Sequence, residues 1–229
     1  MLEKKRPKVL FFDVNETLLD LTEMKGTVGT ALHGRDDLLS LWFSTMLHYS
    51  LVTTAGGHYK PFGHIGAAAL QMVAVTNGII IDEKDARKTI EKALSRLPAH
   101  PDVKPALTAL KEAGYTLVSF TNSSNKGVTK QFAYTGLTSF FDKCLSVEDV
   151  GKFKPFPETY AWAAHQMNVR PEDCMLIAAH GWDVAGALWS GWRAAFVARP
   201  GQQQFPLAPQ VELKAPNLTK IAAQLIAYH

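Results

Sequence analysis

The sequence predicts an α/β fold in which a parallel β-sheet core carries an inserted helical cap domain. The short, continuous apolar run Lys8–Phe12 is typical of a strand that is buried on both faces. Residues 21–99 show helical spacing of apolar residues and no convincing strand. From residue 100 onward strand-like and helix-like segments alternate, which indicates a parallel sheet covered by helices. Residues 1–20 and 100–229 are therefore expected to form one core, with residues 21–99 as the cap.

The cap is expected to be helical because three of its segments place apolar residues three and four positions apart. These segments are Leu38–Leu47, Ile65–Val75 and Ala86–Leu97. Asp82, ahead of the last segment, is a residue type that commonly caps the start of a helix.

The core elements that follow are indicated by apolar runs and by residues that begin or end helices. Gly114 is suited to follow a helix, and Pro155 and Pro157 are suited to precede or begin one. The run Cys174–Ala178 has the character of a second fully buried strand. In chain order we expect a helix at Asp102–Ala113, a strand at Tyr115–Phe120, a helix at Asn125–Tyr134, a strand at Lys143–Ser146, a helix at Glu158–Met167, the strand Cys174–Ala178, a helix reaching Trp189, a strand at Ala194–Val197 and a helix at Leu218–Ala227.

Composition and charge are those of an ordinary globular protein. Of the 229 residues 47% are hydrophobic and 20% charged, and the formal net charge is +3. The basic cluster at residues 4–8 has no interleaved aromatic residues, so we expect no nucleic-acid partner. The longest mostly apolar stretch, Ile65–Val75, is too short to cross a membrane, and the N-terminal apolar run is too short for a signal peptide. Since Cys144 and Cys174 lack a metal-binding spacing, we expect a reduced, cytoplasmic protein with no membrane partner.

Polar side chains follow four of the expected strands. Asp13 follows the first strand and Thr121–Ser124 the second, while Lys154 comes after the third and His180–Asp183 after the fourth. The carboxyl ends of parallel strands meet at one edge of a sheet, and ligands bind there. We therefore expect two carboxylates, a lysine and a turn rich in hydroxyl and amide groups to converge on one crevice.

These residue types permit a specific chemistry. A carboxylate held at the tip of a buried strand, as expected for Asp13, is a candidate covalent nucleophile. Lys154 would keep it ionised, since a cation ~4 Å away contributes about 4 kcal/mol at an effective dielectric of ~20. The Thr121–Ser124 turn begins a helix, whose N-terminus favours an anion. Asp183 would either orient Lys154 or activate water. Taken singly, such an aspartate more often belongs to a turn or a helix cap, and a lysine before a proline is usually a solvated loop residue.

Four segments of the chain resemble motifs of the haloacid dehalogenase-like (HAD) hydrolase superfamily. FFDVNETLLD resembles the first motif, hhhhDxxxT, and FTNSS resembles the second. FKPFPETY is similar to the stretch that carries the family lysine, and AAHGWDVAGALWSGW is similar to the fourth motif. The positions that match functional residues of the family are Asp13 (nucleophile), Thr17 (supporting hydroxyl), Thr121 (hydroxyl at the strand end), Lys154 (lysine), Tyr160 (nearby tyrosine) and Asp183 (acid).

The patterns S-V-E-D-V-G-x-F-K-P and W-D-x-x-G-A are similar in particular to those of type II 2-haloacid dehalogenases. The resemblance implies a Rossmann-like core with a helical cap inserted after the first motif. It implies that a carboxylate displaces the halogen of a small 2-haloacid without a metal or other cofactor, and that the resulting ester is hydrolysed to a 2-hydroxy acid. It also allows a homodimer. The residues expected to bind substrate are Val14 and Asn15 (through backbone N–H groups), Phe43, Thr121, Asn122, Ser123, Tyr160 and Trp182.

Two positions depart from the subfamily pattern. Type II dehalogenases usually carry Trp-Arg early in the cap, whereas here Trp42 is followed by Phe43, which cannot make a charge-assisted hydrogen bond to an anion. His180 stands where an asparagine is usual. It is expected to be a catalytic proton carrier, a donor on the halide side, or a neutral imidazole in a buried hydrogen bond. If they face the cleft, five cap aromatics would form an apolar lid: Trp42, Phe43, Tyr49, Tyr59 and Phe62.

Two other functions stay open on the sequence. The first is a phosphate-ester hydrolase of the same superfamily. Its magnesium-dependent members carry acids where this chain has Asn15 and Ala179, and Mg²⁺ requires several oxygen ligands, so this alternative is disfavoured. The second is a HAD-fold protein whose activity is lost or altered because Phe43 replaces the cap arginine. The retained Asp13, Lys154 and Asp183 argue against it, because binding alone needs no buried nucleophile.

Overall fold

The structure is a computed structural model that describes residues 5–228. Within this range six parallel strands form one sheet, in the order β3-β2-β1-β4-β5-β6. The central strands are continuous apolar runs without exposed residues, as expected for a sheet covered on both faces. The strands are β1 (Val9–Phe12), β2 (Thr116–Thr121), β3 (Lys143–Ser146), β4 (Cys174–Ala178), β5 (Arg193–Val197) and β6 (Leu213–Ala215).

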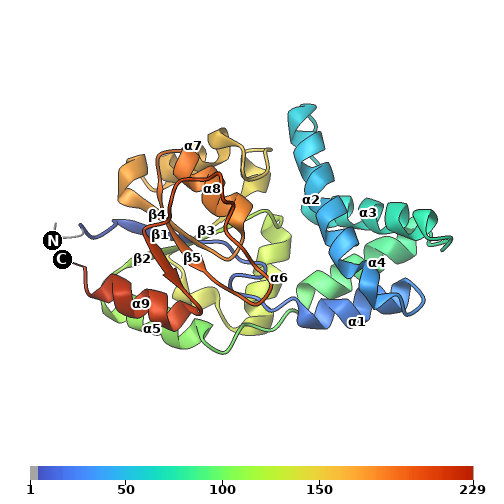
Figure 1. The fold of residues 1–229 in the computed structure, drawn as a ribbon, viewed down its shortest axis with the longest axis horizontal. Helices are drawn as coiled ribbons and strands as arrows, with labels where there is room; N and C mark the ends of the chain where they lie inside the picture. Colours follow the sequence, from blue (N-terminus) through green and yellow to red (C-terminus); the bar gives the residue numbers. More distant parts are fainter. Residues whose placement is uncertain (1–4, 229) are drawn as a thin grey trace.

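Helices cover the two faces of this sheet. Figure 1 shows α5 and α9 below the sheet and α7 and α8 above it, which gives the three-layered, Rossmann-like core that the sequence predicts. The core helices are α5 (Val103–Glu112), α6 (Asn125–Thr135), α7 (Pro157–Gln166), α8 (Gly181–Trp189) and α9 (Leu218–Ile226). Short 3₁₀ helices lie at Asp36–Leu38, Thr138–Phe140, Val147–Asp149 and Pro171–Asp173.

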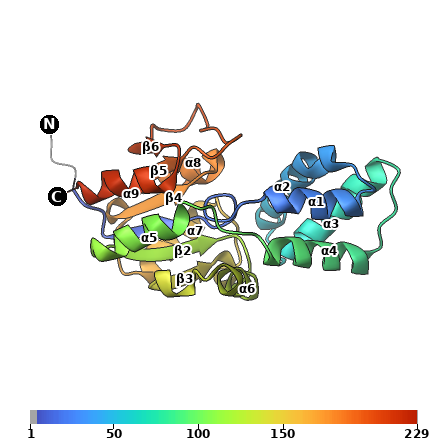
Figure 2. The same cartoon turned by 90° about the horizontal axis from the view of Figure 1, so that it is seen from below.

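The segment between β1 and α5 forms a helical body beside the core (Figures 1 and 2). Its helices are α1 (Thr22–Ala31), α2 (Leu39–Ala55), α3 (Phe62–Thr76) and α4 (Glu83–Ser95). Trp42 of α2 is fully buried and donates from Nε1 to the carbonyl of Gly66 on α3 at 2.8 Å. A side chain at Gly66 would come within 2.8 Å of the sulfur of Met46, so this glycine permits the close approach of α2 and α3.

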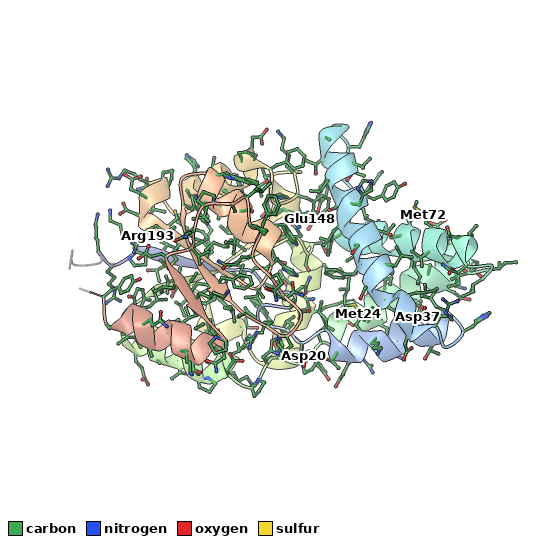
Figure 3. The ribbon with its side chains drawn as sticks, viewed as in Figure 1. Asp20, Met24, Asp37, Met72, Glu148 and Arg193 are labelled. Carbon is green, nitrogen blue, oxygen red and sulfur yellow. The ribbon has the colours of Figure 1, made fainter. Side chains whose placement is uncertain are left out.

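Two linkers that run side by side join this body to the core. The backbone N–H of Asp20 donates to the carbonyl of Pro98 at 2.8 Å, and the N–H of His100 donates to the carbonyl of Leu18 at 2.9 Å. In Figure 3, Asp20 lies at this junction, Asp37 lies far out on the helical body, and Arg193 lies on the opposite side of the core. These linkers contain residues 20 and 98–100; the domain boundaries at residues 20/21 and 99/100 stay a prediction.

Two elements were not predicted from the sequence. Helix α1 (TEMKGTVGTA) contains two glycines and three threonines, which are poor helix formers, so its apolar pattern is weak. It is stabilised by packing against α4. Strand β6 has three residues and follows an irregular segment rich in glutamine and proline, and so gives little local signal. No helix within residues 5–228 is both long and apolar enough to cross a membrane.

Candidate active site

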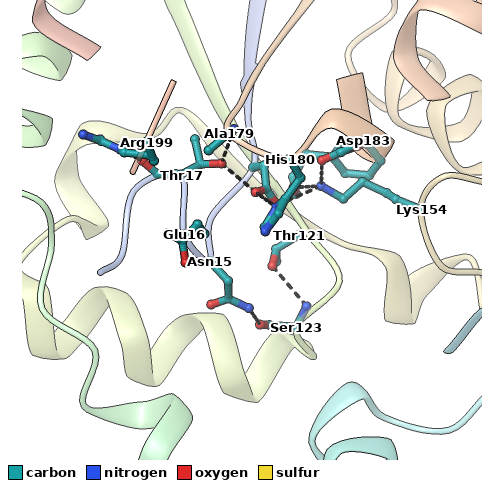
Figure 4. Close-up of polar contacts among 12 residues, drawn as sticks. Asn15, Glu16, Thr17, Thr121, Ser123, Lys154, Ala179, His180, Asp183 and Arg199 are labelled. Atoms are coloured by element: carbon teal, nitrogen blue, oxygen red, sulfur yellow. Dashed lines mark hydrogen bonds and ion pairs between the residues drawn. The ribbon is translucent and has the colours of Figure 1, made fainter. Parts of the chain in front are cut away.

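The polar residues that follow the strands meet at the carboxyl edge of the sheet. Asp13 follows β1, His180 and Asp183 lie at the start of α8 just after β4, and Lys154 lies on the loop between β3 and α7. Figure 4 shows Lys154 extending towards Asp183, with His180 and Thr121 beside them. The structure thus brings together all five residues predicted to be catalytic: Asp13, Thr17, Lys154, His180 and Asp183.

The ammonium group of Lys154 is the centre of the site. Its side chain is 0% exposed, and Nζ lies 3.0 Å from Asp13 Oδ1, 2.5 Å from Asp183 Oδ2 and 2.9 Å from the carbonyl of Phe120. A lysine has three N–H donors, so these contacts use all of them. The cation is therefore fixed in position between the two carboxylates.

The two oxygens of Asp13 have different surroundings. Among residues 5–228 only Lys154 donates to Oδ1, at 3.0 Å. Oδ2 is 2.7 Å from the hydroxyl of Thr17 and 3.0 Å from Nδ1 of His180. The Thr17 hydroxyl donates to Asp13, because an ionised carboxylate can only accept, and the hydroxyl itself accepts from the backbone N–H of Ala179 at 2.9 Å. Within the described chain Oδ1 is thus the oxygen with fewer hydrogen-bond partners.

These contacts shift the pKa values of the buried groups. Burial alone would raise the pKa of Asp13, but the Lys154 charge and the hydrogen bonds of His180 and Thr17 hold it well below its usual value. Burial would lower the pKa of Lys154, whereas the charges of Asp13 and Asp183 raise it. For Asp183, burial and the nearby Asp13 charge raise the pKa, even though Lys154 opposes this shift. Asp13 is therefore the more strongly ionised of the two acids.

Tyr160 lies beside Asp183, where it cannot be reached from solvent. Its ring is fully buried, and its hydroxyl lies 2.6 Å from Asp183 Oδ1. Burial and the Asp183 charge raise the pKa of this hydroxyl well above 10, so it stays a donor. Gly186 of α8 permits the contact, since a Cβ there would lie 2.6 Å from the Tyr160 hydroxyl. The structure places the hydroxyl of Tyr160 on Asp183, and its predicted role in substrate binding stays a prediction.

A second set of contacts holds the turn after β2 against the loop after β1. Asn15 donates from Nδ2 to the hydroxyl of Ser123 at 3.2 Å, and the N–H of Ser123 donates to the Thr121 hydroxyl at 3.0 Å. Gln131 of α6 donates from Nε2 both to Asn15 Oδ1, at 2.9 Å, and to the carbonyl of Leu94 on α4, at 3.0 Å. Gln131 thus connects the core to the cap. A lone glutamine inside a helix carries no sequence signal for this role.

Asn122 and Val14 complete the two loops. Asn122 accepts the backbone N–H of Lys154 at 3.0 Å through Oδ1, while its Nδ2 is buried without a hydrogen-bond partner among residues 5–228. The side chain of Val14 is fully buried, and its carbonyl accepts from the N–H groups of Leu18 and Leu19. Asn122 therefore positions the lysine segment and keeps an unused donor.

Two residues that the sequence did not reveal hold the loop after β1. Arg199, just beyond β5, donates to the carbonyl of Thr17 at 2.9 Å and to Asp102 at 2.9 Å. His100 lies 2.9 Å from the carbonyl of Glu16 through Nε2. Glu16 has φ = 64°, a conformation unusual for residues other than glycine, and these contacts help to hold it there. Each bond joins distant parts of the chain, so no local pattern could have predicted it.

The cap reaches the site through aromatic stacking. The ring of Phe43 on α2 lies 6.3 Å from that of His180 at an interplanar angle of 20°, and the Trp182 ring lies 5.1 Å away at 25°. Phe43, predicted to contact substrate, thus packs on the residue that departs from the subfamily pattern. The other cap aromatics lie elsewhere: Trp42 in the cap core, Tyr59 and Phe62 against Phe153, and Tyr49 against His48.

A cavity of about 300 Å³ lies between the cap and the core. It is lined by Phe62 and Arg87 from the cap and by Ser123, Lys126 and Gln131 from the core, among others. Ser123 and Gln131 line the cavity on the core side, whereas Asp13 is not among its lining residues.

Comparison with known proteins identifies the family of this chain. Residues 7–191 match the family described as haloacid dehalogenase-like hydrolase. The chain belongs to the haloacid dehalogenase-like hydrolase family. It is 30% identical over 201 residues to (S)-2-haloacid dehalogenase 1 of Pseudomonas sp. (strain CBS-3), with 87% of this chain and 88% of that protein covered.

Solved structures of this family share the fold. The chain matches the L-2-haloacid dehalogenase from Xanthobacter autotrophicus with a TM-score of 0.90 and 24% identity, covering 96% of this chain and 99% of that one. The same enzyme with chloropropionic acid covalently bound gives the same values. At this identity the match establishes the fold.

The site does not suit the magnesium ion that some members of the HAD superfamily use. The side-chain oxygen of Asn15 already accepts from Gln131, and Ala179 has no donor atom. The Lys154 ammonium lies between Asp13 and Asp183, where a divalent cation would need the same oxygens. Within residues 5–228 no group of three or more His, Cys, Asp or Glu side chains could hold a metal ion.

Proposed function

We propose that this protein is a hydrolytic dehalogenase that converts small 2-haloacids into 2-hydroxy acids and halide, through an ester on Asp13 and without a metal. The observation that carries the proposal is the buried Lys154, which bridges the carboxylates of Asp13 and Asp183 and takes the position of a cation. The names of its relatives, several of them (S)-2-haloacid dehalogenases, support the same substrate class.

In the first step Asp13 attacks the carbon that bears the halogen. Oδ1 is the expected attacking atom, because Oδ2 already accepts two hydrogen bonds. The depressed pKa of Asp13 keeps the nucleophile ionised at neutral pH. The new bond joins Oδ1 to the substrate carbon, and the halogen leaves with the electron pair of the broken bond.

Lys154, Asp183 and Tyr160 act together to position this nucleophile. Tyr160 fixes Asp183, Asp183 fixes Lys154, and Lys154 fixes Asp13. Such a chain keeps the reactive oxygen oriented before the substrate arrives, which lowers the cost of reorganisation during the reaction.

The carboxylate of the substrate needs donors because Phe43 stands at the position where type II dehalogenases usually carry the cap arginine. We propose that the free Nδ2 of Asn122, the Thr121–Ser123 turn, the backbone at Val14 and Asn15, and the indole of Trp182 supply them. The Nδ2 of Asn122 and the Nε1 of Trp182 are buried and have no hydrogen-bond partner within residues 5–228. A small ligand that accepts hydrogen bonds would satisfy both groups. Cytoplasmic location and a homodimer stay predictions.

The test is halide release from a panel of fluoro-, chloro- and bromoacetate and 2-halopropionates in buffer containing EDTA. We expect halide and hydroxy acid in equal amounts, and no release by the Asp13→Asn variant, which lacks the nucleophile. Thr17→Ser, which keeps the hydroxyl on Oδ2, serves as a control variant that should stay active. No halide release from any compound of the panel, together with magnesium-dependent cleavage of p-nitrophenyl phosphate, would contradict the proposal.

A further inference from the structure

We infer that Gln131 is a positioning residue that makes binding of the substrate carboxylate depend on the docking of the cap. Its amide joins the last turn of α4 in the cap to Asn15, which lies two residues after Asp13. Asn15 in turn holds the Thr121–Ser123 turn. The inference rests on the function proposed above, in which that turn receives the substrate carboxylate.

The two donors of the Gln131 amide are divided between core and cap. Gln131 is only 1% exposed, and its Nε2 donates to Asn15 Oδ1 at 2.9 Å and to the carbonyl of Leu94 at 3.0 Å. An amide NH₂ group has two N–H donors, so both are in use. They diverge at a fixed angle from one planar group, and both bonds form only when the two acceptors stand at a particular spacing. The amide therefore responds to the position of the cap relative to the loop after β1.

The carbonyl of Leu94 lies at the end of a helix, where it depends on a donor from outside. Helix α4 ends at Ser95, and the last carbonyls of a helix lack an intrahelical donor. The N–H that would continue the helical pattern belongs to Pro98, which has none. A buried carbonyl without a donor destabilises a fold, so the donor from Gln131 fixes the end of α4 to the core.

The orientation of the amide follows from its partners. The carbonyl of Leu94 can only accept, so the nitrogen and not the oxygen of the Gln131 amide faces it. Oε1 has no hydrogen-bond partner within residues 5–228. The nitrogen thus makes both of the hydrogen bonds that the amide forms in the described chain, one to each body.

Asn15 passes this contact on to the turn after β2. Its Nδ2 donates to the hydroxyl of Ser123 at 3.2 Å, and the N–H of Ser123 donates to the hydroxyl of Thr121 at 3.0 Å. The carbonyl of Ser123 accepts from the hydroxyl of Ser146 at 2.7 Å, which fixes the other side of the turn to β3 of the core. Of these contacts, the one through Asn15 leads on to the cap. A shift of the cap therefore reaches the turn through Gln131 and Asn15.

A second contact between the same two helices provides a matched control. Lys130 of α6 pairs with Glu91 of α4, and their side chains are 44% and 64% exposed. An exposed ion pair contributes little, because water screens it. Lys130→Met therefore removes a contact between cap and core and leaves the Gln131 amide in place.

The first measurement is chloride release from 2-chloropropionate by the full-length protein, with KM and kcat determined for wild type, Gln131→Met and Lys130→Met. Methionine is similar in length to glutamine but cannot donate. For Gln131→Met we expect KM to rise about tenfold, the scale of one lost hydrogen bond. Its kcat should change less than about threefold, because a loss of ground-state binding appears in KM. Lys130→Met should keep both constants.

A fall in kcat with unchanged KM in Gln131→Met, shown by circular dichroism to be folded, would overturn the inference. An equal rise of KM in Lys130→Met would also overturn it, because any contact between the two helices would then have the same effect. Should Gln131→Met fail to fold, a second variant, Gln131→Glu, decides the question.

Gln131→Glu provides a pH profile that a merely structural role would not produce. An ionised carboxylate can accept from Asn15 once the asparagine amide turns over, but it cannot donate to the carbonyl of Leu94. Burial raises the pKa of a carboxyl group, and protonation returns one O–H donor. As pH falls from about 8 to about 5, the KM of Gln131→Glu should therefore approach that of wild type. A ratio of the two KM values that does not change with pH would overturn the inference.

Other charged groups beside position 131 also titrate in the wild-type protein, so the ratio to wild type removes their effect. These groups line the same cavity: His64, Arg87, Glu91, Lys126 and Lys130. In Gln131→Met, where no carboxyl group is introduced, the ratio should stay constant over the same pH range.

Hydrogen exchange measured by mass spectrometry tests the coupling without any substrate. In Gln131→Met the backbone amides of residues 95–100 and 121–124 should exchange faster than in wild type, whereas Lys130→Met should change neither segment. Unchanged exchange at residues 121–124 would overturn the inference. Absence of halide release by the wild-type protein would instead refute the proposed dehalogenase function. Because the exchange measurement would still decide the role of Gln131, the two failures are distinguishable.

Discussion

The core and the cap contribute to the candidate site in different ways. The core supplies Asp13, Lys154, Asp183, Thr17 and His180, joined by a continuous set of buried hydrogen bonds. The cap supplies the ring of Phe43 and the backbone carbonyl of Leu94. Charge is therefore concentrated on rigid strand ends, and the cap covers it with an apolar surface. Changes in the core should affect chemistry and stability together, whereas changes in the cap should affect access and ordering.

The largest effect is expected when the positive charge of Lys154, at the centre of the core site, is removed. In Lys154→Met the two carboxylates lose their shared partner, so we expect the free energy of unfolding to fall by about 3–5 kcal/mol, the usual range for breaking a buried ion pair. Halide release should fall at least 10²–10³-fold, the range for loss of one electrostatic group. Urea unfolding and a halide assay measure the two effects. Lys152→Met is the control, because Lys152 pairs with Glu158 at the surface and should change stability by less than about 0.5 kcal/mol.

The second test uses pH. The pKa of Asp13 is lower in the folded protein than its ordinary value of about 3.9, so its ionised form stabilises the fold above that pH. This contribution is lost as pH falls below about 4 towards the folded pKa, and each unit of depression corresponds to about 1.4 kcal/mol. Between pH 5 and pH 3 wild-type protein should therefore lose more stability than Asp13→Asn, measured by urea unfolding. Equal losses would show that Lys154 does not hold Asp13 ionised.

The smallest effect is expected for a substitution in the cap. Phe43→Ala removes one ring from the face of His180 and should raise KM several-fold while reducing stability by only about 1 kcal/mol, since Phe43 is half-buried. Tyr49→Ala on the same helix is the control, because Tyr49 packs on His48 and should leave turnover unchanged. A loss in Phe43→Ala as large as that in Lys154→Met would contradict the division between core and cap.

The sequence predicted the parts of the molecule that carry a local signal. The strands β1 and β4 are continuous apolar runs, and Asp13, Lys154 and Asp183 follow strands in the order that places them at one edge. Gln131 and Arg199 were missed because each acts through hydrogen bonds to backbone or side-chain atoms that are distant in the sequence. Phe43 and His180 were each recognised as unusual, but their stacking depends on how the cap folds over the core. Such pairings arise from tertiary packing, which no short pattern encodes.

The paired linkers have a consequence for how this architecture can change. The chain leaves the core at Asp20 and returns at Pro98, and these two residues are joined by a hydrogen bond of 2.8 Å. Because the chain leaves and re-enters the core at adjacent residues, an insertion between them does not change the path of the remaining core chain. Lengthening such an insertion adds little loop-closure entropy. The same six-stranded scaffold could therefore accept a shorter, longer or differently folded module at this position while the aspartate, lysine and histidine beneath it stay where they are.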